Sequence, residues 1–442
     1  MSSVLTRDNN ARPLRRRVSR EVRGIFRNSD KMSLFSGITN QGFIMQLGPK
    51  NSSPPIRIGY CLSLSGAVGG NGRAARLAHQ IWLENINARG GLLGRAVELL
   101  CYDDGSDAAN VEPLYRRLID EDKVDLVIGG YGTNTLLPAM PLMMERQRFF
   151  IGLMGLGVNN ELAYENYFAM IPTGSDPNAA LTEGFFELAA QQKPQPLTVA
   201  LLSADAEFSR NPIRGARKNA AKYGFEVVHE AVYPLNTPDF KPIMDAVAAS
   251  QCDLLFICSY LQDSIDLVKA VHAHAFRPKM VGASMIGPQN ALVKAALGPL
   301  LNGFVNYEYW VPVAAMRFPG VDDMLSTYRV RAAGQDVDPL GHYMAPTAYA
   351  QMQVLEQAVQ ATGGLHDAAL SAYARATSFD TVMGKVRFGV HGEWTEPRVV
   401  QVQYQGIDSD DPMQFLDDAK QVVVTPASMR SGKLIYPYGS AI

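Results

Sequence analysis

The sequence is poor in cysteine and in charged side chains, and it lacks long apolar runs. Only 4 of its 442 residues are cysteines, and 19% are charged. No apolar run approaches the roughly 20 residues that a membrane-spanning helix needs, so we do not expect the chain to span a membrane. The formal net charge of −2 gives no indication of a nucleic-acid partner.

Motifs for catalysis, metal binding and nucleotide binding are also missing. The seven histidines form no metal-ligand pattern, and the chain has no Walker loop and no recognisable nucleophile–base set. The segment Gly282–Gly287 is one residue too long for the G-x-S-x-G turn of a hydrolase. We therefore predict that the chain is not an enzyme and uses no cofactor or metal.

One glycine motif leaves a nicotinamide-dependent enzyme open as an alternative. Residues 70–75 fit a loose G-x-G-x-x-A, and Asp103 and Asp104 end the next strand-like run. The glycines of a dinucleotide loop follow a strand directly, whereas eight residues separate Gly70 from Cys61 here. This placement argues against a cofactor site.

Cysteine spacing allows one disulfide alternative. Cys61 and Cys101 end two strand-like runs that could be neighbours, and no cysteine lies in a C-x-x-C pair. A disulfide between these two residues is one interpretation. We favour two buried thiols.

The amino-terminal segment is basic and unlike the remainder. Residues 1–31 carry nine Lys and Arg against three acidic residues. We expect residues 1–54 to form a disordered basic extension and linker, with Met32 and Met45 as available starts. Residues 33–48 are too polar and too rich in glycine for the apolar segment of a secretory signal, so no convincing signal peptide is predicted.

Short apolar runs alternate with helical segments along most of the chain. In the first series we expect strands and helices in turn: strands at 56–64, 96–104, 124–130 and 149–155, and helices at 73–89, after Asp107 and at 136–146. In the second series we expect strands at 197–205, 225–233, 253–260 and 279–287 with helices between them. Helical segments and two strands around a glycine turn follow at 320–333, 340–362, 367–376 and 385–405.

This alternation predicts an α/β fold with two doubly wound parallel-sheet lobes joined by a three-segment hinge. We place lobe 1 at 55–173 plus 305–388, and lobe 2 at 174–304 plus 389–442. A cleft between two such lobes binds small molecules and closes by hinge motion.

The loop from Gly129 to Thr135 lies between a buried strand and a helix. The amino end of a helix has unpaired N–H groups and a partial positive charge, and ligands of open α/β sheets collect at such positions. The loop could seat a carboxylate or an amide oxygen. Alternatively, its Thr and Asn residues only cap the helix.

Aromatic residues gather at the ends of several expected strands. They either pack in the core or line a cleft, and we leave both interpretations open: Tyr131, Phe208, Tyr260, Tyr307, Tyr309 and Trp310.

Several segments together resemble the type I periplasmic binding proteins of the branched-chain amino acid and amide class, which are leucine-binding-protein-like. They are IRIGYCLSLSG, INARGGLLGRAVELLCYDDGSD, VDLVIGGYGTNTLLPAMPLMMER, DLLFICSY and GFVNYEYW. The resemblance covers residues 56–405. It extends to the cytoplasmic aliphatic-amide sensor, in which a strand is followed by a segment similar to PLMMER.

The resemblance implies a ligand held between the lobes. The ligand-binding residues that it indicates come from both lobes: Tyr131, Gly132, Thr133, Met154, Gly155, Leu156, Phe208, Tyr260, Ser284, Met285 and Tyr307. The first six would hold a carboxylate, and Phe208 and Tyr260 would contribute aromatic rings from the second lobe.

One departure from the family pattern affects the expected ligand. Amino-acid binders of the family place a carboxylate at the position of Ser284, where it pairs with the ligand's ammonium. An ammonium buried without a partner is costly, and only Asp263 and Glu308 are nearby alternatives. An amide, a urea-like compound or an organic acid therefore fits at least as well as an amino acid.

We interpret the chain as a solute-binding protein that captures such a ligand for the permease subunits of an ABC importer. The resemblance implies a periplasmic location. The first alternative is a cytoplasmic sensor of amide-type ligands that controls a regulator, which the missing signal peptide favours. The second alternative is an NAD-dependent enzyme.

Overall fold

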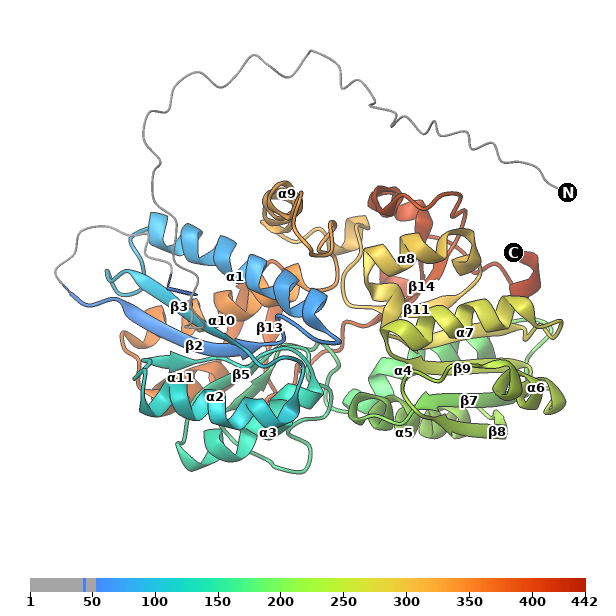
Figure 1. Ribbon diagram of the computed structural model, residues 1–442, viewed down its shortest axis with the longest axis horizontal. Helices are drawn as coiled ribbons and strands as arrows, with labels where there is room; N and C mark the ends of the chain where they lie inside the picture. Colours follow the sequence, from blue (N-terminus) through green and yellow to red (C-terminus); the bar gives the residue numbers. More distant parts are fainter. Residues whose placement is uncertain (1–42, 45–52) are drawn as a thin grey trace, which may run out of the picture. The chain divides into compact units, whose positions relative to one another are not determined.

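A computed structural model describes residues 43–44 and 53–442, which include both expected lobes (Figure 1). The expectations for the basic extension, the alternative starts and the signal segment concern residues 1–54, most of which lie outside these ranges. The expected disorder is wrong at Phe43–Ile44, which form a strand paired with Leu100 and Cys101.

Lobe 1 is built on a four-stranded sheet with the order β1-β3-β2-β4. Strand β2 pairs in parallel with β3 and β4, and β1 is antiparallel to β3. A second parallel pair, β5 with β6, continues beside it through a bridge between Tyr131 and Leu153. These strands are β1 (Phe43–Ile44), β2 (Ile56–Leu62), β3 (Val97–Asp103), β4 (Leu126–Val127), β5 (Phe150–Gly152) and β6 (Tyr167–Ala169).

Six helices and a hairpin complete lobe 1. Asp107 accepts a hydrogen bond from the Ala109 N–H at the start of α2, so the expected cap is confirmed. The elements are α1 (Gly69–Ala88), α2 (Ala108–Asp120), α3 (Thr133–Glu145), α9 (Val321–Ala332), α10 (Ala345–Thr362), α11 (Asp367–Ala376), β12 (Ser378–Thr381) and β13 (Gly384–Arg387).

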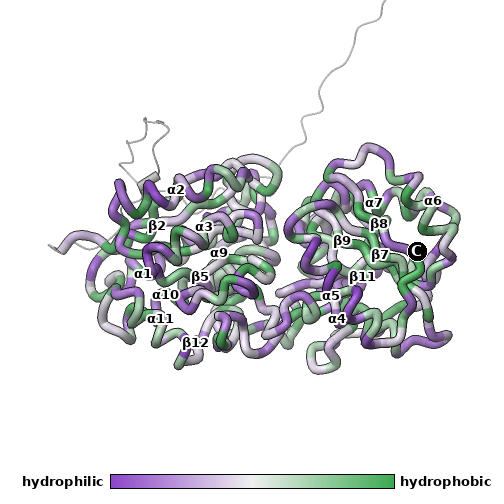
Figure 2. The backbone as a smooth tube through the Cα atoms, turned by 90° about the horizontal axis from the view of Figure 1, so that it is seen from below, coloured by the Kyte–Doolittle hydropathy of each residue, from purple (hydrophilic) through white to green (hydrophobic). Residues whose placement is uncertain are grey.

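Lobe 2 is built on a seven-stranded sheet with the order β15-β14-β11-β10-β9-β7-β8. Strand β9 is buried along its whole length because helices cover both faces of the parallel part, and its run of apolar residues reflects this position (Figure 2). The strands are β7 (Thr198–Ala204), β8 (Glu226–Tyr233), β9 (Leu254–Ser259), β10 (Met280–Met285), β11 (Val305–Glu308), β14 (Val400–Tyr404) and β15 (Gln421–Thr425). The helices are α4 (Pro177–Ala190), α5 (Glu207–Lys222), α6 (Lys241–Ala249), α7 (Leu261–Ala273) and α8 (Ala291–Leu297).

The chain passes between the lobes three times: between β6 and α4, between β11 and α9, and between β13 and β14. Two expected boundaries are wrong. β11 was placed in lobe 1, but it pairs with β10 and belongs to the second sheet. Residues 389–399 were placed in lobe 2, but they stay beside lobe 1, where Ala169 N donates to Gly392 O and Arg398 N to Pro172 O.

The expected hairpin within 385–405 is also wrong. β13 pairs with β12, whereas β14 pairs with β11 and β15 in the other lobe. The segment between them is therefore a crossing, and its length allows the two strands to find separate partners.

Two motifs from the sequence have structural explanations. Helix α1 begins at Gly69 rather than Arg73, so Gly70 and Gly72 lie inside the helix and form no phosphate-binding loop. Cys61 and Cys101 are free thiols on the paired strands β2 and β3. Because Cys61 lies opposite Tyr102 in the register, the two cysteines point to opposite faces of the sheet.

Candidate functional site

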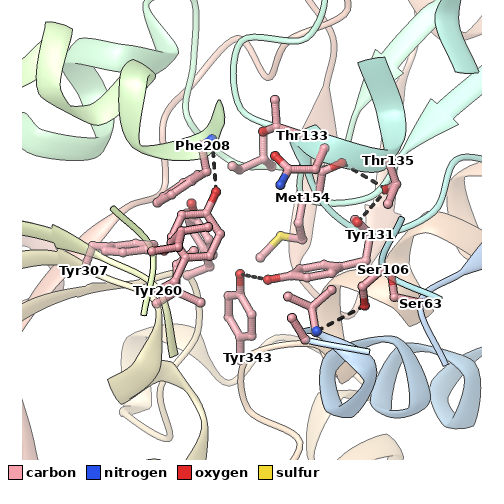
Figure 3. A pocket seen from close by; sticks show the side chains of 18 residues that line it. Ser63, Ser106, Tyr131, Thr133, Thr135, Met154, Phe208, Tyr260, Tyr307 and Tyr343 are labelled. Atoms are coloured by element: carbon pink, nitrogen blue, oxygen red, sulfur yellow. Dashed lines mark hydrogen bonds between the residues drawn. The ribbon is translucent and has the colours of Figure 1, made fainter. Parts of the chain in front are cut away.

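A cavity of about 210 Å³ lies where loops from both lobes meet (Figure 3). Most of its lining comes from the carboxyl ends of strands, the edge at which open α/β sheets bind ligands. The lining residues are Ser63, Ala67, Val68, Ser106, Tyr131, Gly132, Thr133, Asn134, Thr135, Met154, Ile171, Phe208, Leu235, Tyr260, Ile286, Tyr307, Tyr309 and Tyr343.

The loop before α3 supplies the polar part of the lobe 1 wall. Gly132 precedes the helix with a φ of 93°, a conformation that favours glycine, and no side chain caps the first turn. Thr135 Oγ1 donates instead to the carbonyl of Tyr131 at 2.6 Å. The threonines therefore do not serve as N-caps, and the amino end of α3 faces the cavity without a capping side chain.

Thr133 has a hydroxyl with a defined direction. Its Oγ1 accepts the N–H of Leu156 at 3.0 Å. Because one lone pair is used in this way, the hydroxyl proton is available to donate into the cavity. The carbonyl of Leu156 accepts from Asn211 Nδ2 at 3.0 Å, which joins the two lobes.

Tyrosines form much of the remaining wall. Tyr131 and Tyr343 share a hydrogen bond of 3.0 Å between their hydroxyls, and Asn71 Nδ2 donates to the Tyr131 hydroxyl. The ring of Tyr343 stacks on Tyr309 with centroids 6.3 Å apart, and Tyr307 meets Tyr309 edge to face. The Tyr309 hydroxyl is buried without a hydrogen-bond partner.

Lobe 2 presents Phe208 and Tyr260 to the cavity. Their rings meet edge to face with centroids 6.2 Å apart. The Tyr260 hydroxyl accepts the N–H of Phe208 at 3.2 Å, so its proton, like that of Thr133, can be donated to a ligand.

The cavity is electrically neutral near pH 7. Burial raises the pKa values of Tyr131 and Tyr260, and raises those of Tyr307, Tyr309 and Tyr343 well above the usual range. These hydroxyls therefore remain protonated. Among the lining residues, all of which belong to the described part of the chain, none is Asp, Glu, Lys, Arg or His.

The structure separates the expected site residues into two groups. Seven line the cavity: Tyr131, Gly132, Thr133, Met154, Phe208, Tyr260 and Tyr307. Four do not: Gly155, Leu156, Ser284 and Met285.

The four residues outside the lining have structural surroundings of their own. Gly155 packs against Leu136 of α3, and both backbone polar groups of Leu156 are bonded within the protein. Ser284 and Met285 are fully buried in β10, and the next residue, Ile286, reaches the cavity instead. The backbone just before Ser284 is irregular, with a φ of 108° at Ala283.

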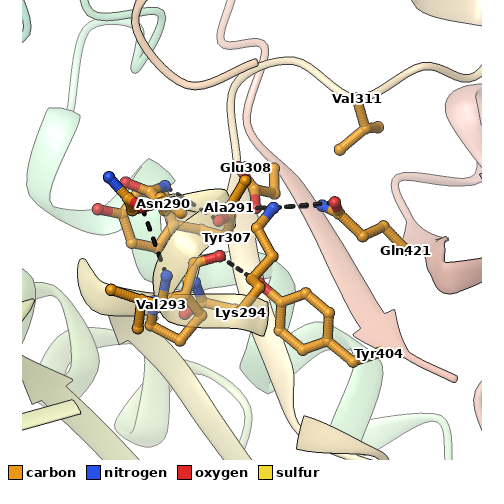
Figure 4. A network of polar contacts seen from close by, with 12 residues as sticks. Asn290, Ala291, Val293, Lys294, Tyr307, Glu308, Val311, Tyr404 and Gln421 are labelled. Carbon is orange, nitrogen blue, oxygen red and sulfur yellow. Dashed lines mark hydrogen bonds and ion pairs between the residues drawn. The ribbon is translucent and has the colours of Figure 1, made fainter. Parts of the chain in front are cut away.

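Neither alternative partner for an ammonium lines the cavity. Asp263 is buried in the first turn of α7, where its Oδ1 accepts the N–H of Asn236. Glu308 belongs to a buried network in lobe 2, in which Lys294 Nζ lies 3.4 Å from its Oε1 and Gln421 bonds to both side chains (Figure 4).

Sequence reasoning missed several lining residues. Ser63 follows β2 and Ser106 follows β3, and the carboxyl ends of such parallel strands are the signal by which both could be found. Tyr343 lies just before α10 and carries no local signal. Its contact with Tyr131 joins residues 212 positions apart, so only the folded chain reveals it.

Comparisons with known proteins agree with this architecture. The profile of the family described as "Periplasmic binding protein" matches residues 55–406. The Leu/Ile/Val-binding protein of Escherichia coli (strain K12) is 22% identical over 342 residues, covering 76% of this chain and 88% of the relative.

Two solved structures share the fold. The branched-chain amino acid transporter substrate-binding protein LivJ from Streptococcus pneumoniae, in complex with isoleucine, has a TM-score of 0.67 at 16% identity, covering 87% of this chain and 100% of that chain. An ABC-transporter solute-binding protein from R. palustris, in complex with benzoate, has a TM-score of 0.69 at 16% identity, covering 86% and 98%.

Within the described part of the chain, no helix is long and apolar enough to cross a membrane. No group of three or more His, Cys, Asp or Glu side chains there could hold a metal ion.

Proposed function

Because the chain belongs to the periplasmic binding protein family, we propose that its cavity captures a small amide, urea-like compound or organic acid for an ABC importer. The expected family and the expected binding role without catalysis are confirmed by the family match and by the relatives, which are binding proteins.

The observation that carries this proposal is the neutral lining. Thr133 and Tyr260, from opposite lobes, both have hydroxyl protons available for a ligand oxygen. No carboxylate lines the cavity to pair with an ammonium, and burying an unpaired ammonium costs several kcal/mol. A ligand with oxygen acceptors and an apolar body fits this arrangement better than a free amino acid.

The two related structures contain ligands of two different classes, an amino acid (isoleucine) and an organic acid (benzoate). The tyrosine-rich lining of this chain favours a ligand of the second kind, because aromatic rings pack well against a flat apolar body.

A thermal-shift screen tests the ligand class. The purified protein is heated with branched-chain amino acids, short amides, urea and aromatic or aliphatic acids at millimolar concentration. A compound at about 1,000 times its dissociation constant adds about 4 kcal/mol to the free energy of unfolding, which gives a clear shift. Shifts with acids or amides, and none with amino acids, are expected. A shift with leucine-like ligands alone would contradict the proposed class.

Calorimetric titration of variants tests the site. Thr133→Ala combined with Tyr260→Ala is expected to weaken the binding of the best compound at least tenfold, because two hydrogen-bond donors are lost. Thr327→Ala, at an exposed position of α9, serves as the control. Unchanged affinity in the double variant would mean that the ligand binds elsewhere.

We also propose that the protein works in the periplasm with permease subunits. Fractionation of cells that naturally express it, followed by co-purification with membrane proteins, checks both statements. Recovery only from the cytoplasm, together with a regulatory protein, would instead favour a ligand sensor.

A further inference from the structure

Two serines lie side by side in the lobe 1 wall and share one buried carboxylate. Ser63 Oγ donates to Asp104 Oδ1 at 2.5 Å, and the N–H of Ser106 donates to the same oxygen at 2.9 Å. Both serines line the cavity (Figure 3), whereas Asp104 lies behind them and is 0% exposed.

The carboxylate determines the direction of the Ser63 hydroxyl. Asp104 Oδ1 accepts two hydrogen bonds, and its Oδ2 is buried without a partner. Because the Ser63 proton points to this carboxylate, only the oxygen lone pairs of Ser63 remain for the cavity. Ser63 can therefore accept a hydrogen bond from a ligand but cannot donate one.

Three other lining hydroxyls, those of Ser106, Thr133 and Tyr260, differ from Ser63 in this respect. Ser106 Oγ donates to the carbonyl of Ser65 at 2.7 Å and accepts the N–H of Val68 at 3.2 Å, so both of its roles are filled by the backbone. Thr133 and Tyr260 each accept a backbone N–H, so their hydroxyl protons, unlike that of Ser63, remain available to a ligand. The cavity thus offers donors at Thr133 and Tyr260, and acceptors at Ser63 and at Thr135, whose proton is donated to the Tyr131 carbonyl.

We propose that Ser63, oriented by Asp104, binds a neutral O–H or N–H group of the ligand. This inference rests on the proposed function and narrows it to compounds that carry a hydrogen-bond donor as well as an acidic or carbonyl oxygen, such as a hydroxylated aromatic acid or a primary amide. The donor is neutral rather than an ammonium, because the carboxylate is screened from the cavity by Ser63 itself.

Matched pairs of compounds test the proposal by calorimetric titration. A pair is neutral when the donor group that distinguishes its two members is uncharged: hydroxybenzoates against benzoate, and pentanamide against methyl pentanoate. In the charged pair, leucine against 4-methylpentanoate, this group is an ammonium. In at least one neutral pair, the donor-bearing member is expected to bind about tenfold more tightly, which corresponds to about 1.4 kcal/mol.

Variants at the two serines show whether Ser63 causes this preference. Ser63→Ala is expected to reduce the ratio of dissociation constants to about 1 while leaving the weaker member's affinity nearly unchanged. Ser63→Cys, whose thiol is somewhat larger and is a weaker acceptor, should give an intermediate ratio. Ser106→Ala, the matched control, should affect both members of a pair equally and preserve the ratio.

If Ser63→Ala still binds the donor-bearing member more tightly, the assignment of Ser63 is overturned. If the two dissociation constants of each neutral pair are already equal in the native protein, the assignment is also overturned, but the proposed function is left intact. Tight binding of leucine that Asp104→Asn abolishes would show that the site takes a cation and would overturn the neutral donor. Failure of every compound to bind would count against the proposed function as well.

Discussion

Lys294 and Glu308 form a buried pair of opposite charges in lobe 2, each only 1% exposed. Burial raises the pKa of Glu308 to about 7, and the attraction of Lys294 opposes this rise. Gln421 accepts from Lys294 Nζ at 2.9 Å and donates to Glu308 Oε1 at 3.3 Å. Removing one partner of such a pair is far more costly than the pair is worth, because the remaining charge is left buried.

Lys294→Met is expected to destabilise the protein more at pH 8 than at pH 5. The folded-state pKa of Glu308 lies above its unfolded value of 4.5, so ionising this carboxyl lowers stability as the pH rises from about 4.5 to about 7. Without Lys294 the free energy of unfolding continues to fall at higher pH, and its loss reaches about 3 kcal/mol at pH 8. Urea unfolding of the variant and the native protein at both pH values measures the difference.

The double variant Lys294→Met with Glu308→Gln is the control for this prediction. It removes the titrating group, so its loss of unfolding free energy should be nearly the same at pH 5 and at pH 8. An equal loss at pH 5 and pH 8 in the single variant would contradict the role given to Glu308.

At the scale of a single element, helix α1 shows how close packing positions the site. A Cβ atom added at Gly72 would lie 1.9 Å from the carbonyl oxygen of Ser63, whereas one added at Gly70 would meet nothing within 4 Å. The first turns of α1 therefore pack directly on the loop that carries Ser63. Two glycines of one helix thus have different roles, and the G-x-G spacing reflects helix packing rather than a cofactor loop.

Gly72→Ala is expected to destabilise the protein by about 1–3 kcal/mol, because the added methyl group forces α1 away from the Ser63 loop. Gly70→Ala, the matched control in the same helix, should be neutral or stabilising by up to about 1 kcal/mol, since alanine favours helix. Thermal and urea unfolding of both variants gives the comparison. Equal effects at the two positions would show that the packing contact is unimportant.

At the scale of the whole binding unit, the two lobes are joined by side-chain contacts as well as by the three chain crossings. Asn211 of α5 donates to Leu156 O in lobe 1. Asp338, which precedes α10, accepts the N–H of Ala291 at the start of α8 at 2.6 Å. Such contacts favour the arrangement in which residues of both lobes surround the cavity, so they contribute indirectly to affinity.

Asn211→Ala is expected to weaken ligand binding about fivefold, because a hydrogen bond between the lobes is worth about 1 kcal/mol. The free energy of unfolding should change less than for a core substitution. Calorimetric titration with the best compound of the screen measures affinity, and small-angle scattering of the free protein should show a larger radius of gyration. Arg210→Ala, whose exposed side chain is on the same helix, should bind the compound as the native protein does.

Local sequence patterns predicted some features of the fold and of the cavity, and not others. The mainly apolar runs of β2 and β9 predicted buried parallel strands, and both lie within sheets as expected. The loop at Gly132 and Thr133 was expected at the cavity and lies there. Ser284 was expected beside it as well, but β10 turns Ile286 toward the cavity, and local sequence does not encode that irregular backbone.

The sequence by itself determined the alternation of strands and helices, the parallel cores of the two sheets and the family, because periodic apolar patterns and contiguous motifs are local properties. Tertiary structure decided which strands pair after the third crossing, why Tyr343 meets Tyr131, and which hydroxyls donate or accept. These features depend on contacts between residues far apart in the chain. Hydrogen-bond direction in particular is set by the partner behind each hydroxyl, as Asp104 does for Ser63 and Leu156 for Thr133.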